Sequence, residues 1–84
     1  MASTTVVVGS AIGLHARPAA IIAEAAAKYD DEILLEFDGE EADAASALMI
    51  MSLGAENGAE VVVTSDNADG LKEIAALVAQ DLDA

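Results

Sequence analysis

Apolar residues recur along the chain with two different spacings, which predicts a mixture of short strands and short helices. Runs of β-branched residues and short half-apolar segments are typical of strands. Apolar residues three and four positions apart are typical of helices that pack on one side. The expected strands lie at residues 4–8, 32–37, 40–42 and 60–65. The expected helices lie at residues 16–28 and 47–53, followed by a last helix whose apolar stripe extends from Leu71 to Leu82.

Polar and small residues between these segments predict where elements begin and where the chain turns. Asp-Gly at 38–39 is a dipeptide of tight hairpins, and Asn-Gly at 57–58 predicts another turn. Ser46 is expected to cap the second helix, which Gly54 ends in a left-handed conformation. An Asp or Asn at 66, 67 or 69 is expected to cap the last helix.

The predicted order of elements is β-α-β-β-α-β-α, which favours an α+β fold. Short, half-apolar strands suit an antiparallel sheet with one face covered by helices and the other in contact with water. A chain of 84 residues is the size of one domain, so residues 1–84 are expected to form a single unit without a second lobe.

The charge of the chain excludes some classes of partner. Sixteen acidic residues face three basic ones, and the net charge is −13. Binding to nucleic acid or to an anionic membrane surface needs Lys and Arg, so neither is expected. No segment resembles a signal peptide or a membrane span, and there is no Cys, which together favour a cytoplasmic protein. The acidity also suggests adaptation to a salty cytoplasm.

The rarest residue types of this chain gather in one short segment, G-L-H-A-R-P-A at 13–19. It contains the one His (His15), the one Arg (Arg17) and the one Pro (Pro18). A surface histidine without a role is the simplest interpretation of His15. A metal site is disfavoured, because only carboxylates are left to complete a ligand shell. Nothing around the Ser residues is typical of a nucleophile in a catalytic triad.

The segment fits a third interpretation, in which His15 carries a transferable phosphoryl group. A neutral imidazole is a nucleophile near pH 7. If His15 caps the first helix, the backbone N–H of Ala16 and the helix dipole favour an anion beside it. Arg17 adds a guanidinium suited to phosphate oxygens, and Pro18 stiffens the first turn.

Two segments of the chain resemble HPr, the histidine-containing phosphocarrier family of the sugar phosphotransferase system. They are G-L-H-A-R-P-A at 13–19 and D-A-A-S-A-L-M-I-M-S-L-G at 43–54. The resemblance implies an open-faced sandwich of four antiparallel strands with three helices on one side. It also implies a carrier without a cofactor, not an enzyme. His15 would accept phosphate on Nδ1 from phosphorylated Enzyme I and pass it to the A domains of Enzymes II, with Arg17 neutralising the phosphoryl group.

The resemblance further implies a regulatory site and a docking face. Ser46 matches the serine that HPr kinase/phosphorylase modifies in many relatives, although an ordinary N-cap explains this residue equally well. Spacing predicts that Ile50 and Leu53 point inward, and that three other apolar side chains of the short helix lie on an outward arc beside His15. The expected docking residues are Ala20, Ala47, Leu48 and Met51.

Two other functions remain open on the sequence alone. One is a regulatory module of a nitrogen-related phosphotransferase branch, which would signal through its phosphorylation state. The other is an interaction domain in which His15 is inert. In each case the chain is expected to be a monomer.

Overall fold

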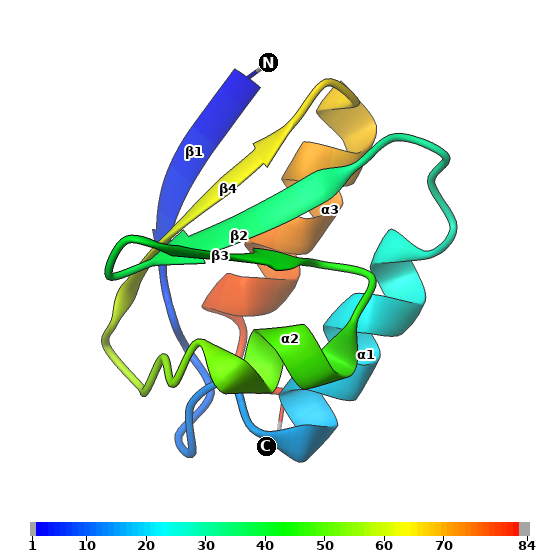
Figure 1. Ribbon diagram of the computed structural model, residues 1–84. Coiled ribbons are helices and arrows are strands. Elements are labelled where there is room, and N and C mark those ends of the chain that lie inside the picture. Colours follow the sequence, from blue (N-terminus) through cyan, green and yellow to red (C-terminus); the bar gives the residue numbers. More distant parts are fainter. Residues whose placement is uncertain (1, 83–84) are drawn as a thin grey trace.

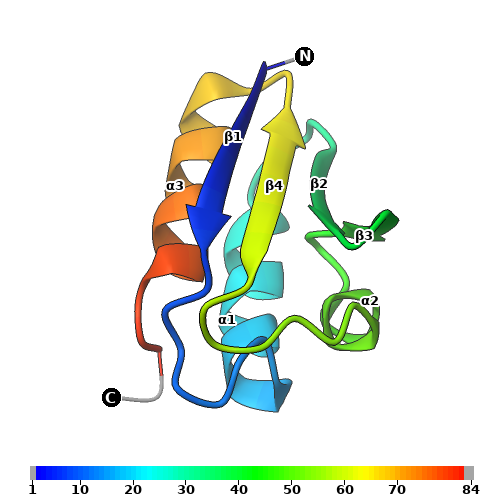
Figure 2. The same ribbon diagram turned by 90° about the vertical axis from the view of Figure 1, so that its left-hand side faces the viewer.

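A twisted antiparallel sheet carries helices on one of its faces (Figures 1 and 2). The computed structural model describes residues 2–82, and these residues form four strands and three helices. The strands are β1 (Ala2–Val7), β2 (Ile33–Phe37), β3 (Glu40–Asp43) and β4 (Glu60–Ser65), and the helices are α1 (Ala16–Ala26), α2 (Ala47–Ser52) and α3 (Ala68–Ala79). The predicted fold class and order of elements are confirmed.

The strands pair in the spatial order β1-β4-β2-β3, and every pairing is antiparallel. In Figure 2, β1 and β4 lie in front of α1, α3 lies beside β1, and α2 lies below β3. Alternate residues of β4 are buried, because the side chains of a strand point to its two faces in turn. Val61 and Val63 therefore face the helices, while Val62 lies on the other face and is only half-buried.

The core is built from aliphatic side chains of every layer. Its largest fully buried members include Ile22 of α1, Leu35 of β2, Ile50 of α2 and Ile74 of α3. The hairpin between β2 and β3 is as the Asp-Gly dipeptide predicts, since residues 38 and 39 have φ angles of 55° and 81°.

Several predicted boundaries differ from the observed ones by one or two residues. The strand expected at 4–8 is Ala2–Val7, and the helix expected at 16–28 ends at Ala26. Leu82 lies beyond the end of α3 at Ala79, yet it packs against the core as a member of the predicted stripe. Ile21 has the spacing of the packed side of α1, but it is exposed beside a groove between α1 and α3. Helix ends are weakly specified by sequence, because the last turn is stabilised mainly by what it packs against.

Candidate functional site

His15 lies at the point where the loop after β1 becomes α1. It is the N-cap residue of α1, with φ −90° and ψ −167°, and its side chain makes no capping hydrogen bond. The residue before it, Leu14, is buried, and so are Pro18 and Ala19. Because these neighbours anchor the backbone on both sides, the His15 side chain is exposed at a fixed position on the surface.

The first turn of α1 presents backbone N–H groups next to His15. The first N–H groups of an α-helix have no acceptor within the helix. In α1 these groups belong to Ala16 and Arg17, because Pro18 has no N–H and the Ala19 N–H donates to the His15 carbonyl at 2.8 Å. Donors and a helix dipole of this kind form a site for an anion.

A hollow of about 210 Å³ opens beside His15. Its lining consists of Ile12, Leu14, His15, Met51, Gly54, Ala55 and Glu56. The loop after β1 supplies one wall, and α2 with the loop that follows it supplies the other. His15 is therefore neither packed inside the protein nor shielded from a tetrahedral group.

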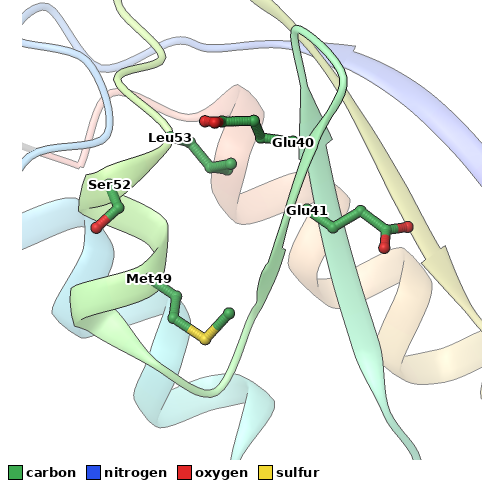
Figure 3. Close-up of a pocket in the computed structure, with 5 residues that line it drawn as sticks. All are labelled: Glu40, Glu41, Met49, Ser52 and Leu53. Carbon is green, nitrogen blue, oxygen red and sulfur yellow. The ribbon is translucent and has the colours of Figure 1, made fainter.

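A larger hollow, of about 370 Å³, lies on the other side of α2 and is shown in Figure 3. It is lined by Glu40, Glu41, Met49, Ser52 and Leu53. The Glu41 side chain points away from α2 in this view. The lining of this larger hollow contains neither a histidine nor a cationic side chain, so the smaller hollow beside His15 is the better candidate for phosphate chemistry.

Arg17 supplies the positive side chain of the site. It is exposed on the first turn of α1, two residues after His15. Within residues 2–82, the structure gives Arg17 no ion pair, so its guanidinium is available to an anion. Lys28, by contrast, is paired with Glu73 at 3.0 Å near the opposite end of α1.

Among the described residues, the pKa values that are shifted belong to Tyr29 and Glu73, which lie with Lys28 away from the His15 site. The Tyr29 hydroxyl donates a short hydrogen bond to Glu73, which lowers the pKa of the Glu73 carboxyl, and Lys28 adds to this effect. The same hydrogen bond raises the pKa of Tyr29. Residues 2–82 contain no group of three His, Asp or Glu side chains that could hold a metal ion. None of the helices in this range has the length and apolar character required to span a membrane.

The short helix α2 divides its apolar side chains between the core and the surface. Ile50 is fully buried and Leu53 is buried beside it, as the spacing predicts. Leu48 is 73% exposed and Met51 is 37% exposed. Met51 lines the hollow beside His15, and an exposed apolar patch usually marks a surface for a partner.

The other two predicted docking residues differ in exposure. Ala20 is exposed on α1, whereas Ala47 is half-buried and packs against the core, so its side chain offers less to a partner than the spacing suggested. Ser46 is the N-cap of α2 as predicted, and its Oγ accepts a hydrogen bond from the Met49 N–H at 3.3 Å.

Sequence reasoning missed two residues that line the His15 hollow. Ile12 is 56% exposed, although it is a large apolar side chain. Glu56 is exposed on the opposite wall. The available signal for Ile12 was an isolated large apolar residue in a predicted loop, directly before the segment that contains His15. Nothing in the sequence placed Glu56 beside His15, because the two lie on loops far apart in the chain.

Comparisons with known proteins identify the family of this chain. The family model described as the PTS HPr component phosphorylation site matches residues 2–80. The phosphocarrier protein HPr of Bacillus anthracis strain Ames is 34% identical, with a TM-score of 0.85, and the match covers 92% of this chain and 95% of that one. HPr-C-His of Thermoanaerobacter tengcongensis is 31% identical, with a TM-score of 0.89 over 100% of this chain and 98% of that one.

A third similar structure is Crh, the catabolite repression containing protein of Bacillus subtilis, which was solved as a domain-swapped, intertwined dimer. It is 34% identical, with a TM-score of 0.72 over 93% of each chain. The family match extends over nearly the whole chain, and the site residues lie within it. The chain therefore belongs to the HPr family of phosphocarrier proteins of the phosphotransferase system.

Proposed function

We propose that His15 accepts a phosphoryl group from phosphorylated Enzyme I and passes it to the A domains of Enzymes II for sugar uptake. In the first step, the lone pair of the His15 Nδ1 attacks phosphorus. The bond between phosphorus and Enzyme I breaks as the bond to His15 forms. In the second step the acceptor domain attacks the same phosphorus, and His15 leaves as the neutral imidazole. The chain is regenerated, so it acts as a carrier and not as an enzyme.

Each neighbour of His15 has a role in this cycle. The N–H groups of Ala16 and Arg17 stabilise the phosphoryl oxygens, and the Arg17 guanidinium neutralises part of their charge. Pro18 fixes the first turn, so these donors are already oriented before phosphate arrives. The observation that carries the proposal is that His15 is an exposed N-cap without a side-chain hydrogen bond, beside a hollow of about 210 Å³.

The apolar surface formed by Ile12, Leu48 and Met51 is the proposed docking site for Enzyme I and for the A domains. Ile12 and Met51 line the same hollow as His15, and Leu48 lies three residues before Met51 on the same side of α2. Methionine side chains adapt to differently shaped partners, which suits a carrier with a donor and several acceptors. Because Glu56 lies at the rim and the net charge is −13, an Enzyme I adapted to a basic carrier is expected to bind poorly.

A phosphorylation assay with a matched Enzyme I and phosphoenolpyruvate tests the proposal. The protein is expected to take up one acid-labile phosphate, because phosphohistidine is lost in acid and phosphoserine is not. His15→Ala is expected to fold normally and to take up none. Stable phosphate on the variant would overturn the assignment of His15.

The second step separates the carrier from a regulatory module. A carrier discharges its phosphate to an Enzyme II A domain, whereas a regulator of a nitrogen-related branch retains it. Purified phosphoprotein mixed with an A domain is therefore expected to lose its label within the time that Enzyme I needs to load it. Retention of the label would favour the regulatory alternative.

Regulation, location and oligomeric state complete the proposal. HPr kinase/phosphorylase is proposed to modify Ser46, and the added charge would weaken docking at α2. We propose that the protein acts in the cytoplasm and that it is a monomer. Light scattering tests this state, and a dimer mass would instead resemble the assembly of Crh.

A further inference from the structure

The Asn57 side chain joins the loop after α2 to the loop that carries His15. Its Nδ2 lies 3.4 Å from the Val8 carbonyl oxygen, 3.4 Å from that of Gly9 and 3.1 Å from that of Ser10. Three acceptors at one end of the side chain require the amide nitrogen to lie there, because the amide oxygen would be repelled. We propose that Asn57 is a positioning residue, which limits the movement of His15 by holding the 8–14 loop that leads into it.

Backbone hydrogen bonds extend this contact from Asn57 to His15. The Gly58 N–H donates to the Val8 carbonyl at 3.0 Å, next to the Asn57 contact. At the far end of the loop, the Leu14 N–H donates to the Ala55 carbonyl at 2.9 Å. Residues 55–58 therefore lie against both ends of the 8–14 loop, and Figure 2 shows the two loops side by side below the sheet.

The middle of the 8–14 loop depends on Asn57 more than its ends do. Residues 11 and 12 are exposed and contribute nothing to the core. The loop closes on itself through the Gly13 N–H, which donates to the Ser10 carbonyl at 3.0 Å. That same carbonyl accepts the shortest of the three Asn57 hydrogen bonds. Asn57 thus holds the residue on which the turn into Leu14 and His15 is built.

A further anchor holds the loop on its other side. The Gly9 N–H donates to the Val78 carbonyl at 3.0 Å, and Ser10 Oγ accepts from the Leu82 N–H at 3.3 Å. These contacts attach the loop to the end of α3 and keep the fold intact without Asn57. Asn57 is itself exposed, so its removal leaves carbonyls that water can reach. Loss of Asn57 is therefore expected to loosen the loop without unfolding the protein.

The consequence for phosphoryl transfer follows from geometry, and it rests on the proposed function. A displacement of about 1 Å between reacting groups can reduce a rate ~100-fold. His15 must meet phosphorus while the Ala16 and Arg17 N–H groups face its oxygens. When the loop is more mobile, His15 adopts several positions, and only some of them allow phosphoryl transfer. Transfer slows although every group that touches phosphate is still present.

The test compares Asn57→Leu, which keeps the size of the side chain and removes its donors, with two other variants. Asn57→Gln keeps the amide and is expected to restore part of the rate. Asn67→Leu is the matched control, because Asn67 caps α3 at the other end of the molecule, where its Oδ1 accepts from the Gly70 N–H at 2.9 Å. Asn57→Leu is expected to slow phosphorylation of His15 about 10-fold per folded molecule. Asn67→Leu is expected to lower the urea midpoint and leave that rate unchanged.

A second measurement, on unphosphorylated protein, does not depend on the proposed function. Asn57→Leu is expected to speed amide hydrogen exchange at Gly13, whose N–H donates to the Ser10 carbonyl, and to shift the His15 ring resonances, and Asn67→Leu is expected to do neither. Equal transfer rates in wild type and Asn57→Leu would overturn the proposal, and so would unchanged exchange and ring resonances. If wild-type protein takes up no phosphate at all, the proposed function fails, and this second measurement still decides whether Asn57 positions His15.

Discussion

Gly13→Ala tests whether the loop that carries His15 is held as tightly as the structure indicates. Gly13 has φ +79°, a region that other residues enter at a cost of ~1 kcal/mol. A Cβ at this position would also lie 2.7 Å from the Ala55 carbonyl oxygen and 2.8 Å from the Glu56 Cα. Both neighbours are backbone atoms, which cannot rotate away as the end of a side chain can. The loop must therefore move.

The expected cost can be built from these contacts. Movement away from residues 55 and 56 lengthens the hydrogen bond from the Leu14 N–H to the Ala55 carbonyl, now 2.9 Å, and such a bond contributes ~1 kcal/mol. The backbone cost and the weakened hydrogen bond together are expected to lower the free energy of unfolding of Gly13→Ala by about 2 kcal/mol.

Gly39→Ala is the control, because Gly39 has φ +81° and nothing within 4 Å of its Cβ position. It should lose only the backbone part, ~1 kcal/mol. Urea unfolding of both variants measures the difference in their free energies of unfolding, provided that the slope of free energy against urea concentration is the same for both. Equal losses would show that the loop yields without strain, and the reasoning about its rigidity would be refuted.

Four other expectations concern charge, capping and pH. Arg17→Ala should slow phosphoryl transfer about 10-fold or more while leaving the urea midpoint unchanged. The control Lys72→Ala, which removes one positive charge from α3, should transfer phosphate at the wild-type rate. Equal transfer rates in Arg17→Ala and wild type would show that Arg17 is not part of the site. Ser46→Ala should lower the free energy of unfolding by ~1 kcal/mol through loss of the α2 cap, and an unchanged urea midpoint would contradict the observed cap. Tyr29→Phe should be less stable than wild type near pH 7. In the folded protein the pKa of Glu73 is lowered and that of Tyr29 is raised, so the stability difference should shrink as pH falls through the pKa of Glu73 or rises through the pKa of Tyr29. Melting temperatures that differ equally at all pH values would exclude this hydrogen bond as the cause. Molar salt should raise the melting temperature, because it screens repulsion in a chain of net charge −13, and a melting temperature independent of salt would argue against adaptation to a salty environment.

Local signals in the sequence were sufficient where one short segment decides the structure. The Asp-Gly hairpin has the positive φ angles that this dipeptide tolerates. Ser46 caps its helix as predicted, and Asn67, one of three candidates, caps the last helix; each accepts a hydrogen bond from the backbone N–H of the third residue after it. In the same way, the G-L-H-A-R-P-A segment contains its own helix start. The place of His15 at the N-cap therefore follows from its immediate neighbours in the sequence.

Contacts between distant segments could not be read in this way. The spacing rule placed Ala47 outward with Leu48, but packing against the core leaves it half-buried. Ile21 had the spacing of a core residue, yet it lies at the exposed edge between α1 and α3. A short helix has more apolar positions than one contact can cover, so its neighbours decide which of them reach solvent.

The chain by itself determined the order of the elements and the α+β class, because periodicity, caps and turn residues act over a few neighbouring positions. The segment at 13–19 predicted a phosphoryl site at His15. Only the tertiary structure decided what surrounds His15. The hollow with Glu56 and Met51 exists because the loop after α2 returns beside the loop after β1. In the sequence, Asn-Gly at 57–58 predicted only a turn. The hydrogen bonds of the Asn57 side chain to residues 8–10 depend on the fold, which brings together segments almost fifty positions apart.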